Sequence, residues 1–391
     1  MTEQVEQAVA NLLAAHDAGS VDRQTFLGAR FDAGLAWIHF PMGCGGLGLP
    51  REQQAQVEAA LAAAGAPGVD PAANPIGLGM VAPTLATHGS QEQRALLRPL
   101  FTAEHVWCQL FSEPGAGSDL AGLATRAVRD RDIWTITGQK VWTSYAHKAR
   151  WGLLLARTDP DVPKHRGLTC FIVDMHGPGV EVRPLRQLTG QAEFNEVFLT
   201  SVQVPDSMRL GALGAGWQVA NTTLMNERVS IGGGAAPREA GFVGSVMDLW
   251  RSRPEVRTAS GHERIVRLWI DAEVARLANE RSRQIMAAGQ PSADGSGAKI
   301  VFADILQRAT RLRWELSGID GLQYDTWQPE PTVAHSLSPQ RAPAVNYLRM
   351  RAASIEGGTS EVLRGVIADR VLELPREPRQ DTTLPWREVP R

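Results

Sequence analysis

Hydrophobic residues in the first hundred positions recur at the spacing of an α-helix. Val5, Val9 and Leu12 lie three or four residues apart, which places their side chains on one helical face. The same period predicts helical segments over residues 5–49, 53–64 and 91–102, the first of which ends in a glycine-rich loop. We therefore expect an N-terminal α-helical domain over residues 1–106.

Between Trp107 and about Pro205 the hydrophobic period changes to two. Short apolar runs bounded by Gly, Pro and Asp are typical of β-strands. The runs cover residues 107–111, 134–136, 151–156, 168–173, 180–182 and 196–199. We expect a central β-sheet domain over residues 107–213.

After Gly216 the helical period returns. The expected helices cover residues 217–231, 238–251, 262–288, 299–322, 340–353 and 360–372. Segments rich in Pro and Gly at 290–297 and 328–331 are predicted as turns, and the tail after Pro375 as extended. The chain is thus expected to be an α+β multidomain protein whose C-terminal part, residues 214–391, is a four-helix bundle with an extended tail.

The composition describes a globular chain with a large core. It has 391 residues, of which 43% are hydrophobic, and a formal net charge of −2. No basic run stands out, so neither nucleic acid nor an anionic membrane is an expected partner. Cys44, Cys108 and Cys170 lie far apart without a C-x-x-C pair, which predicts buried free thiols and no metal site.

No apolar run reaches the length of a membrane-spanning helix. The start of the chain, residues 1–6, lacks the basic and apolar segments of a secretion signal. We therefore expect a cytoplasmic protein.

Arginine carries almost all of the basic charge. Lysine occurs only at positions 140, 148, 164 and 299. We attribute this bias to the codon usage of a GC-rich genome and not to function.

The first segment with candidate chemistry is the strand-like run that leads into residues 113–118. This loop has the sequence Glu-Pro-Gly-Ala-Gly-Ser, and its glycines leave backbone N–H groups unobstructed. Such a loop can cradle an anion or the edge of a flat polar ring.

The second segment follows about one hairpin later. Alternation over residues 132–138 with a terminal Gly predicts a β-hairpin that delivers Trp142, Thr143 and Ser144. An aromatic face beside hydroxyl donors suits a heterocycle with carbonyl and N–H edges. Taken alone, each segment is more often an ordinary turn or a core tryptophan.

Together the two segments resemble the acyl-CoA dehydrogenase family, whose members carry a Glu-Pro-Gly-Ala-Gly-Ser-Asp loop and a Lys-x-Trp strand at this distance. The similarity continues through residues 167–173, 214–217 and 355–364, so it covers most of the chain. The resemblance implies FAD as the cofactor, with contacts to the isoalloxazine from Phe111, Ser112, Trp142, Thr143, Ser144, Thr359 and Glu361. It also implies that Ser118 lies on the acyl-CoA side and that FAD lies between the β domain and the bundle.

The family's reaction is the α,β-dehydrogenation of an acyl-CoA thioester to a trans-2-enoyl-CoA, with electrons passed to an electron-transfer flavoprotein. The resemblance therefore implies an acyl-CoA substrate, that flavoprotein as a partner, and a homodimer, a homotetramer or a hetero-oligomer with a sister subunit. One subgroup acts on bulky substrates such as sterol side-chain thioesters, and some of its members contain two different subunits.

This chemistry needs a carboxylate base at the α carbon and hydrogen-bond donors for the thioester oxygen. Family members place the base at one of two positions. The Glu-Arg pair at Glu227 matches the earlier one, whereas Glu356 falls one residue short of the later one, so we predict Glu227 with Glu356 as second choice. With Glu227 as base, the backbone of Gly357 and Gly358 is the expected oxyanion donor.

Two family segments are missing. The Arg-x-x-Phe-Gly segment that contacts the FAD pyrophosphate of a neighbouring subunit is replaced at residues 254–261, and the Gln-x-x-Gly-Gly-x-Gly segment is not seen around 331–339. These losses leave open a non-catalytic or half-site partner subunit. An acyl-CoA oxidase or a flavin monooxygenase of the same fold is a further alternative.

Overall fold

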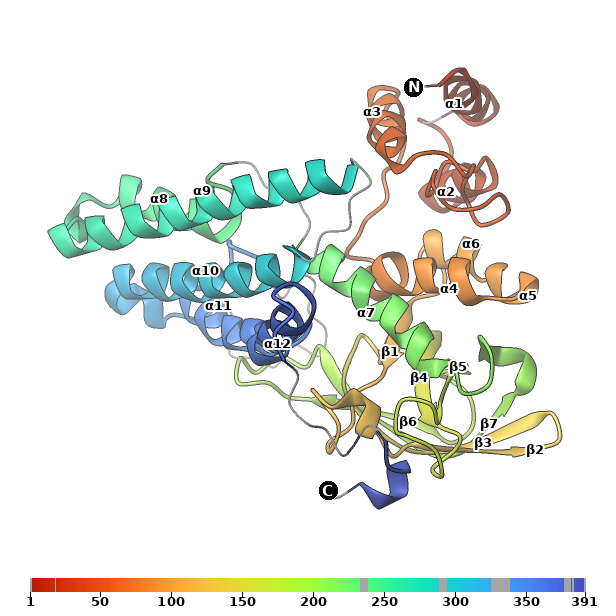
Figure 1. The fold of residues 1–391 in the computed structure, drawn as a ribbon. Helices are drawn as coiled ribbons and strands as arrows, with labels where there is room; N and C mark the ends of the chain where they lie inside the picture. The colour runs from red at the N-terminus through yellow and green to blue at the C-terminus, as the bar shows by residue number, and fades with distance from the viewer. Residues whose placement is uncertain are drawn as a thin grey trace. The chain divides into compact units, whose positions relative to one another are not determined.

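The computed structural model describes residues 2–17, 19–232, 238–287, 294–324, 338–375, 381 and 383–389. The chain divides into two compact units (Figure 1). The sheet unit consists of Met1–Pro184, Phe194–Asn226 and Arg379–Arg391, and the bundle unit of Leu185–Glu193 and Glu227–Pro378. The turn predicted at 328–331 and the start of the one at 290–297 lie outside the described residues.

The N-terminal helices gather on their own small core and on the sheet. They are α1 (Glu3–Ala15), α2 (Arg23–Asp32), α3 (Gln54–Ala63), α4 (Ala82–His88), α5 (Gln91–Arg94) and α6 (Leu97–Phe101), with a π-helical turn at Gly77–Val81. The helical segment predicted over 5–49 is not continuous. The side chain of Asp22 accepts the N–H of Thr25 and caps the start of α2, and residues 33–50 form a loop. In that loop a Cβ at Gly46 would lie 2.2 Å from the carbonyl of Phe40, so only glycine fits.

Each of the six predicted strand runs overlaps a strand of one sheet, although β1 ends one residue before Phe111. The strands are β1 (Trp107–Leu110), β2 (Arg126–Asp130), β3 (Ile133–Ser144), β4 (Trp151–Arg157), β5 (Leu168–Asp174), β6 (Val180–Leu185), β7 (Phe194–Pro205) and β8 (Arg209–Leu210). Their order is β6-β7-β3-β2-β4-β5-β8, and β1 pairs with β4 in parallel. The prediction of a central β-sheet domain is confirmed.

Strand β4 is buried on both faces, which explains its unbroken apolar sequence. Leu153 and Leu155 point into a core shared with α4 and α6, whereas Leu154 and Ala156 point into a second core on the other face of the sheet. Strand β4 is thus packed on both faces and is hydrogen-bonded to β1 and to β5 at its sides. The sheet unit is therefore a rigid support for the loops at its strand ends.

The predicted hairpin is displaced. Strand β3 runs without a break through Gly138, and the tight turn lies earlier, at Arg131 and Asp132 between β2 and β3. A Cβ at Gly138 would lie 2.3 Å from the hydroxyl of Thr125, so this glycine permits close packing and does not form the turn.

The bundle unit is helical, as predicted. After α7 (Gly216–Gly232), which begins in the sheet unit, it contains α8 (Gly241–Ser252), α9 (Ala259–Ala287), α10 (Asp294–Leu316), α11 (Pro343–Arg349) and α12 (Ser360–Arg370). Helix α10 starts five residues before the predicted Lys299, and the helix predicted over 340–353 ends as a 3-10 turn at Met350–Ser354. The core of the bundle unit joins Val246 of α8, Leu268 of α9 and Leu312 of α10.

The part of the tail that the structure describes is not simply extended. It contains a 3-10 turn at Trp386–Glu388 and a bridge between Pro385 and Pro163. No helix within the described ranges is both long and apolar enough to span a bilayer.

Candidate active site

The loop at residues 113–118 is a tight turn with an open outer face. Glu113 and Ala116 exchange two backbone hydrogen bonds, each with an N–O distance of 3.0 Å. A Cβ added at Gly115 or Gly117 would meet nothing within 4 Å. Because neither packing nor a positive φ requires these glycines, their small size leaves the backbone accessible to a ligand. Ser118 follows on this exposed face.

Beneath the loop lies a buried ion pair. The ammonium of Lys140, which is fully buried, donates to Oε1 of Glu113 at 2.9 Å and to the carbonyls of Phe111 and Leu155 at 2.9 and 2.8 Å. Glu113 also accepts the backbone N–H groups of Ala124 and Thr125 at 2.7 and 2.8 Å. These contacts fix the start of the loop at residues 113–118, which we call the ligand loop.

Burial and charge act in opposite directions on this pair. Burial lowers the pKa of Lys140 to about 8, although the Glu113 carboxylate raises it. For Glu113 burial raises the pKa, but the charge and hydrogen bonds of Lys140 outweigh it and hold the pKa below its usual value. The carboxylate of Glu113 is therefore charged and already used as a structural anchor.

Trp142 sits at an irregular point of β3. The register between β3 and β7 shifts between Lys140 and Thr143, and Trp142 has a φ of 60°, which is unusual for a bulky residue. The residue is 58% exposed, and its ring meets the ring of Phe194 edge-on, with centroids 5.8 Å apart. The bulge thus presents an aromatic face outside the packed core.

Two further features of the sheet unit fit a heterocyclic ligand. The hydroxyl of Thr143 is buried and has no hydrogen-bond partner in the part of the chain that the structure describes. The backbone N–H of Val141 donates to the carbonyl of Ser112 at 2.9 Å, which joins the loop to β3. Phe111 is buried, whereas Ser112 and Ser144 are half-buried. The open loop, the exposed Trp142 face and the orphaned Thr143 hydroxyl are features that FAD would complete.

The bundle unit contains the two predicted bases in different surroundings. Glu356 accepts a bidentate ion pair from Arg349, with N–O distances of 3.1 and 3.0 Å. Arg349 is itself nearly buried and donates through Nε to Glu193 at 2.9 Å. Glu227 lies half-buried in α7. Glu356 is therefore part of a structural ion-pair network.

The loop between Glu356 and α12 has an unusual backbone. Gly357 and Gly358 have φ values of 65° and 94°, in the region that favours glycine. The hydroxyl of Thr359 accepts the N–H of Val362 at 3.1 Å and caps α12, whereas Glu361 is exposed. The predicted contacts of Thr359 and Glu361 with the flavin stay predictions.

Sequence reasoning missed the buried lysines. Of the four lysines in the chain, Lys140, Lys164 and Lys299 are buried. A chain that uses arginine almost everywhere else has kept lysine mainly where a compact ammonium is enclosed by carbonyl or carboxylate oxygens. Lysine scarcity was visible in the sequence and, read this way, pointed to these positions.

Asp381 and Trp386 of the tail bind residues that lie close to the end of the ligand loop. Lys164 pairs with Asp119, next to Ser118, and with Asp381 of the tail, at 2.7 and 2.5 Å. The Trp386 ring lies 4.5 Å from the guanidinium carbon of Arg157, and its N–H donates to the carbonyl of Gly122 at 3.1 Å. The tail is thus part of the support of the segment that follows residue 118.

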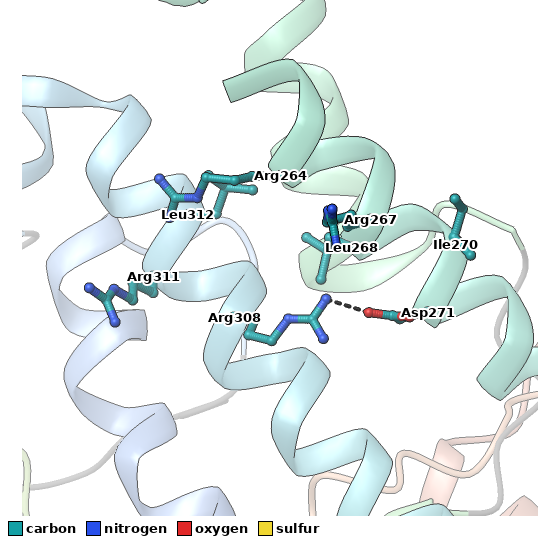
Figure 2. A pocket seen from close by; sticks show the side chains of 8 residues that line it. All are labelled: Arg264, Arg267, Leu268, Ile270, Asp271, Arg308, Arg311 and Leu312. Atoms are coloured by element: carbon teal, nitrogen blue, oxygen red, sulfur yellow. Dashed lines mark hydrogen bonds and ion pairs between the residues drawn. The ribbon is translucent and has the colours of Figure 1, made fainter. Parts of the chain in front are cut away.

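A separate hollow of about 570 Å³ lies between α9 and α10 (Figure 2). Four arginines line it, and each pairs with a carboxylate. The pairs are Arg264 with Glu315, Arg267 with Glu263, Arg308 with Asp271 and Arg311 with Glu315. Since these carboxylates balance the arginines and no predicted site residue lines the hollow, it is not part of the candidate active site.

Models of the acyl-CoA dehydrogenase family match the chain along most of its length. The N-terminal domain model matches residues 1–104, the middle domain model residues 108–202 and the C-terminal domain model residues 214–372. The chain belongs to the acyl-CoA dehydrogenase family of oxidoreductases, and the predictions of family and fold are confirmed.

Its relatives include two acyl-CoA dehydrogenases of Mycobacterium tuberculosis. The chain is 36% identical to IpdE1 over 351 residues, which cover 88% of this chain and 86% of IpdE1. It is 43% identical to FadE34 over 299 residues, which cover 75% of this chain but only 39% of FadE34.

Two solved structures are similar to this chain over nearly its whole length. The Tcur3481-Tcur3483 steroid ACAD is 25% identical, with a TM-score of 0.73 and coverage of 96% of this chain and 98% of that one. The ChsE4-ChsE5 complex from Mycobacterium tuberculosis is 26% identical, with a TM-score of 0.69 and coverage of 96% and 99%.

Proposed function

We propose that this protein is an FAD-dependent acyl-CoA dehydrogenase that converts an acyl-CoA thioester to a trans-2-enoyl-CoA. Bound FAD supplies the acceptor for the β hydride, and its electrons leave to an electron-transfer flavoprotein. Family membership and the fit of the sheet-unit loop to a flavin support this proposal. Phe111, Ser112, Trp142, Thr143 and Ser144 are the residues that would hold the isoalloxazine.

Glu227 is the proposed base that removes the α proton. The observation that carries this choice is the bidentate pair between Glu356 and Arg349. A carboxylate held by a nearly buried guanidinium has both oxygens engaged, so neither oxygen is positioned to take a proton from a substrate. Because the resemblance places the base at one of these two positions, the engagement of Glu356 favours Glu227. The backbone of Gly357 and Gly358 would stabilise the thioester oxygen as it becomes enolate-like.

The proposed substrate carries a bulky acyl group, such as a steroid side chain. Support comes from the similar solved structure described as a steroid ACAD. Turnover with a short straight-chain acyl-CoA at the same kcat/KM as with a steroid side-chain thioester would contradict this choice.

We further propose that a second chain of this fold covers α9. Its exposed face carries an apolar stripe at helical spacing, formed by Val266, Ile270, Val274 and Leu277, which are 41–60% exposed. Two similar solved structures are named for pairs of proteins. Ile270→Glu should shift the native mass to that of a smaller species, while Arg267→Glu, on an exposed neighbouring position, should not. An unchanged mass for Ile270→Glu would contradict the proposal.

The chain expressed alone provides the direct test of function. Purified protein should be yellow, hold about one FAD per chain and lose its flavin absorbance anaerobically when a suitable acyl-CoA is added. A colourless protein that FAD does not reconstitute would exclude the proposal and favour a non-catalytic partner subunit. Stoichiometric peroxide formation at the rate of dye reduction would instead identify an oxidase.

A further inference from the structure

Lys299 of α10 lies against the loop that carries the predicted oxyanion donors. Only 1% of the residue is exposed, and its ammonium donates to the carbonyls of Ala353 and Gly358, both at 2.8 Å. One contact is in the 3-10 turn before Glu356 and the other is in the glycine pair after it. A single side chain therefore joins both sides of the Glu356–Thr359 loop.

This loop needs an external clamp. Gly357 and Gly358 are adjacent and both have positive φ values, and glycine loses more conformational freedom on ordering than any other residue. The backbone hydrogen bonds of residues 355 and 356 go to Ala352 and end before the glycines. Among the described residues, the side-chain hydrogen bond that reaches the glycine pair is the one from Lys299 to the Gly358 carbonyl.

Lys299 carries an ionisable group in a buried position. Burial lowers its pKa, while the carboxylates of Glu356, Glu227 and Glu361 raise it. In the part of the chain that the structure describes, both of its hydrogen bonds nevertheless go to carbonyl oxygens. An apolar residue would fill the same space without the cost of burying an ammonium, so a role for the charge and the donors is indicated.

We propose that Lys299 is a positioning residue for catalysis, which fixes the Gly357–Gly358 backbone in the conformation that stabilises the enolate oxygen formed when Glu227 removes the α proton. This inference rests on the proposed function. Because a peptide unit is planar and trans, holding the Gly358 carbonyl fixes the plane of the Gly358–Thr359 peptide, which limits the rotation of the glycine pair just before it. Preorganised donors of this kind lower the barrier without reorganisation during the reaction.

The test separates α-proton removal from hydride transfer. A 3-thia-acyl-CoA has an acidic α proton but sulfur in place of the β carbon, so it can form the enolate and cannot be oxidised. An enolate stacked on oxidised flavin gives a long-wavelength charge-transfer band. Lys299→Met should weaken this band at saturating probe by about ten-fold and lower kcat similarly, with little change in KM, since a displaced loop affects the transition state most.

Lys148→Met is the matched control, because Lys148 is exposed, and it should keep the wild-type band. Lys299→Arg retains a cation and N–H donors in a larger head group and should lose only about three-fold. FAD content and thermal unfolding are measured for each variant. If Lys299→Met does not fold, the Arg variant carries the test, and a wild-type band there would overturn the inference.

The two possible failures are distinguishable. No band in the wild-type protein with its FAD bound would contradict the proposed function. A wild-type band that persists unchanged in a folded Lys299→Met protein would contradict only the role of Lys299.

Discussion

Two buried lysines hold two candidate ligand loops, and they differ in what balances their charge. Lys140 donates to two backbone carbonyls and also directly to Glu113. Lys299 likewise donates to two carbonyls, but within the described ranges none of its hydrogen bonds goes to a carboxylate. Three glutamates of the bundle unit act on its charge without such a bond.

We propose that this difference separates a structural site from a reactive one. In the sheet unit the Glu113 carboxylate accepts three hydrogen bonds, from Lys140 and from the backbone N–H groups of Ala124 and Thr125, so it anchors the loop. In the bundle unit Arg349 forms an ion pair with Glu356, and in our proposal Glu227 is the base. A glutamate thus anchors a loop in the sheet unit, and we propose that a glutamate acts as the catalytic base in the bundle unit.

The largest expected effect on stability comes from breaking the sheet-unit pair. Lys140→Met would leave Glu113 without its cation and would remove the hydrogen bonds that the ammonium donates to the carbonyls of Phe111 and Leu155. We expect a loss of about 3–5 kcal/mol in the free energy of unfolding, measured by urea denaturation. The comparison also predicts that Lys140→Met together with Glu113→Gln costs clearly less than the sum of the single changes. Additive costs would show that the two side chains do not act as a pair.

A smaller effect is expected from acid. Because the folded state holds the pKa of Glu113 below its ordinary value of 4.5, this carboxylate stabilises the fold fully above that pH. Its contribution is lost as the pH falls through the lowered folded pKa. Denaturation between neutral pH and pH 3 should therefore show weaker pH dependence in Glu113→Gln than in wild type. Glu6→Gln, at an exposed position of α1, should follow the wild type.

The smallest effect concerns the tail. Trp386→Ala removes the ring over Arg157 and the N–H donated to Gly122, and should cost about 1–2 kcal/mol of unfolding free energy. Trp386→Phe keeps a ring and should lose only the hydrogen bond. Equal stability of the Ala variant and wild type would mean that the tail does not support the segment after Ser118.

Hydrophobic period predicted the fold well because burial repeats along each element. The run at 151–156 is a strand buried on two faces, and the C-terminal helices follow their apolar stripes. The turn before β3 was misplaced because Gly138 is required by the close approach of Thr125, a contact that is distant in sequence. Local turn signals cannot distinguish such packing from a chain reversal.

The candidate site was only partly predictable. Motif spacing indicated the ligand loop and Trp142, whereas the partners of Glu356 and Lys299 depend on tertiary contacts. Arg349 lies seven residues before Glu356 and Glu193 lies 156 residues before Arg349, so no short motif joins them. The predicted site residues of the two units remain predictions to be tested by substitution.

The most direct test of the central claim compares the two glutamates. Glu227→Gln conserves volume but removes the proton acceptor, and should reduce the rate of flavin reduction by about 10²- to 10⁴-fold while FAD stays bound. Glu356→Gln should keep most of that rate and instead weaken the link to Arg349. Rates are measured anaerobically by stopped flow with the same acyl-CoA. An inactive Glu356→Gln beside an active Glu227→Gln would contradict the account and assign the base to the C-terminal motif.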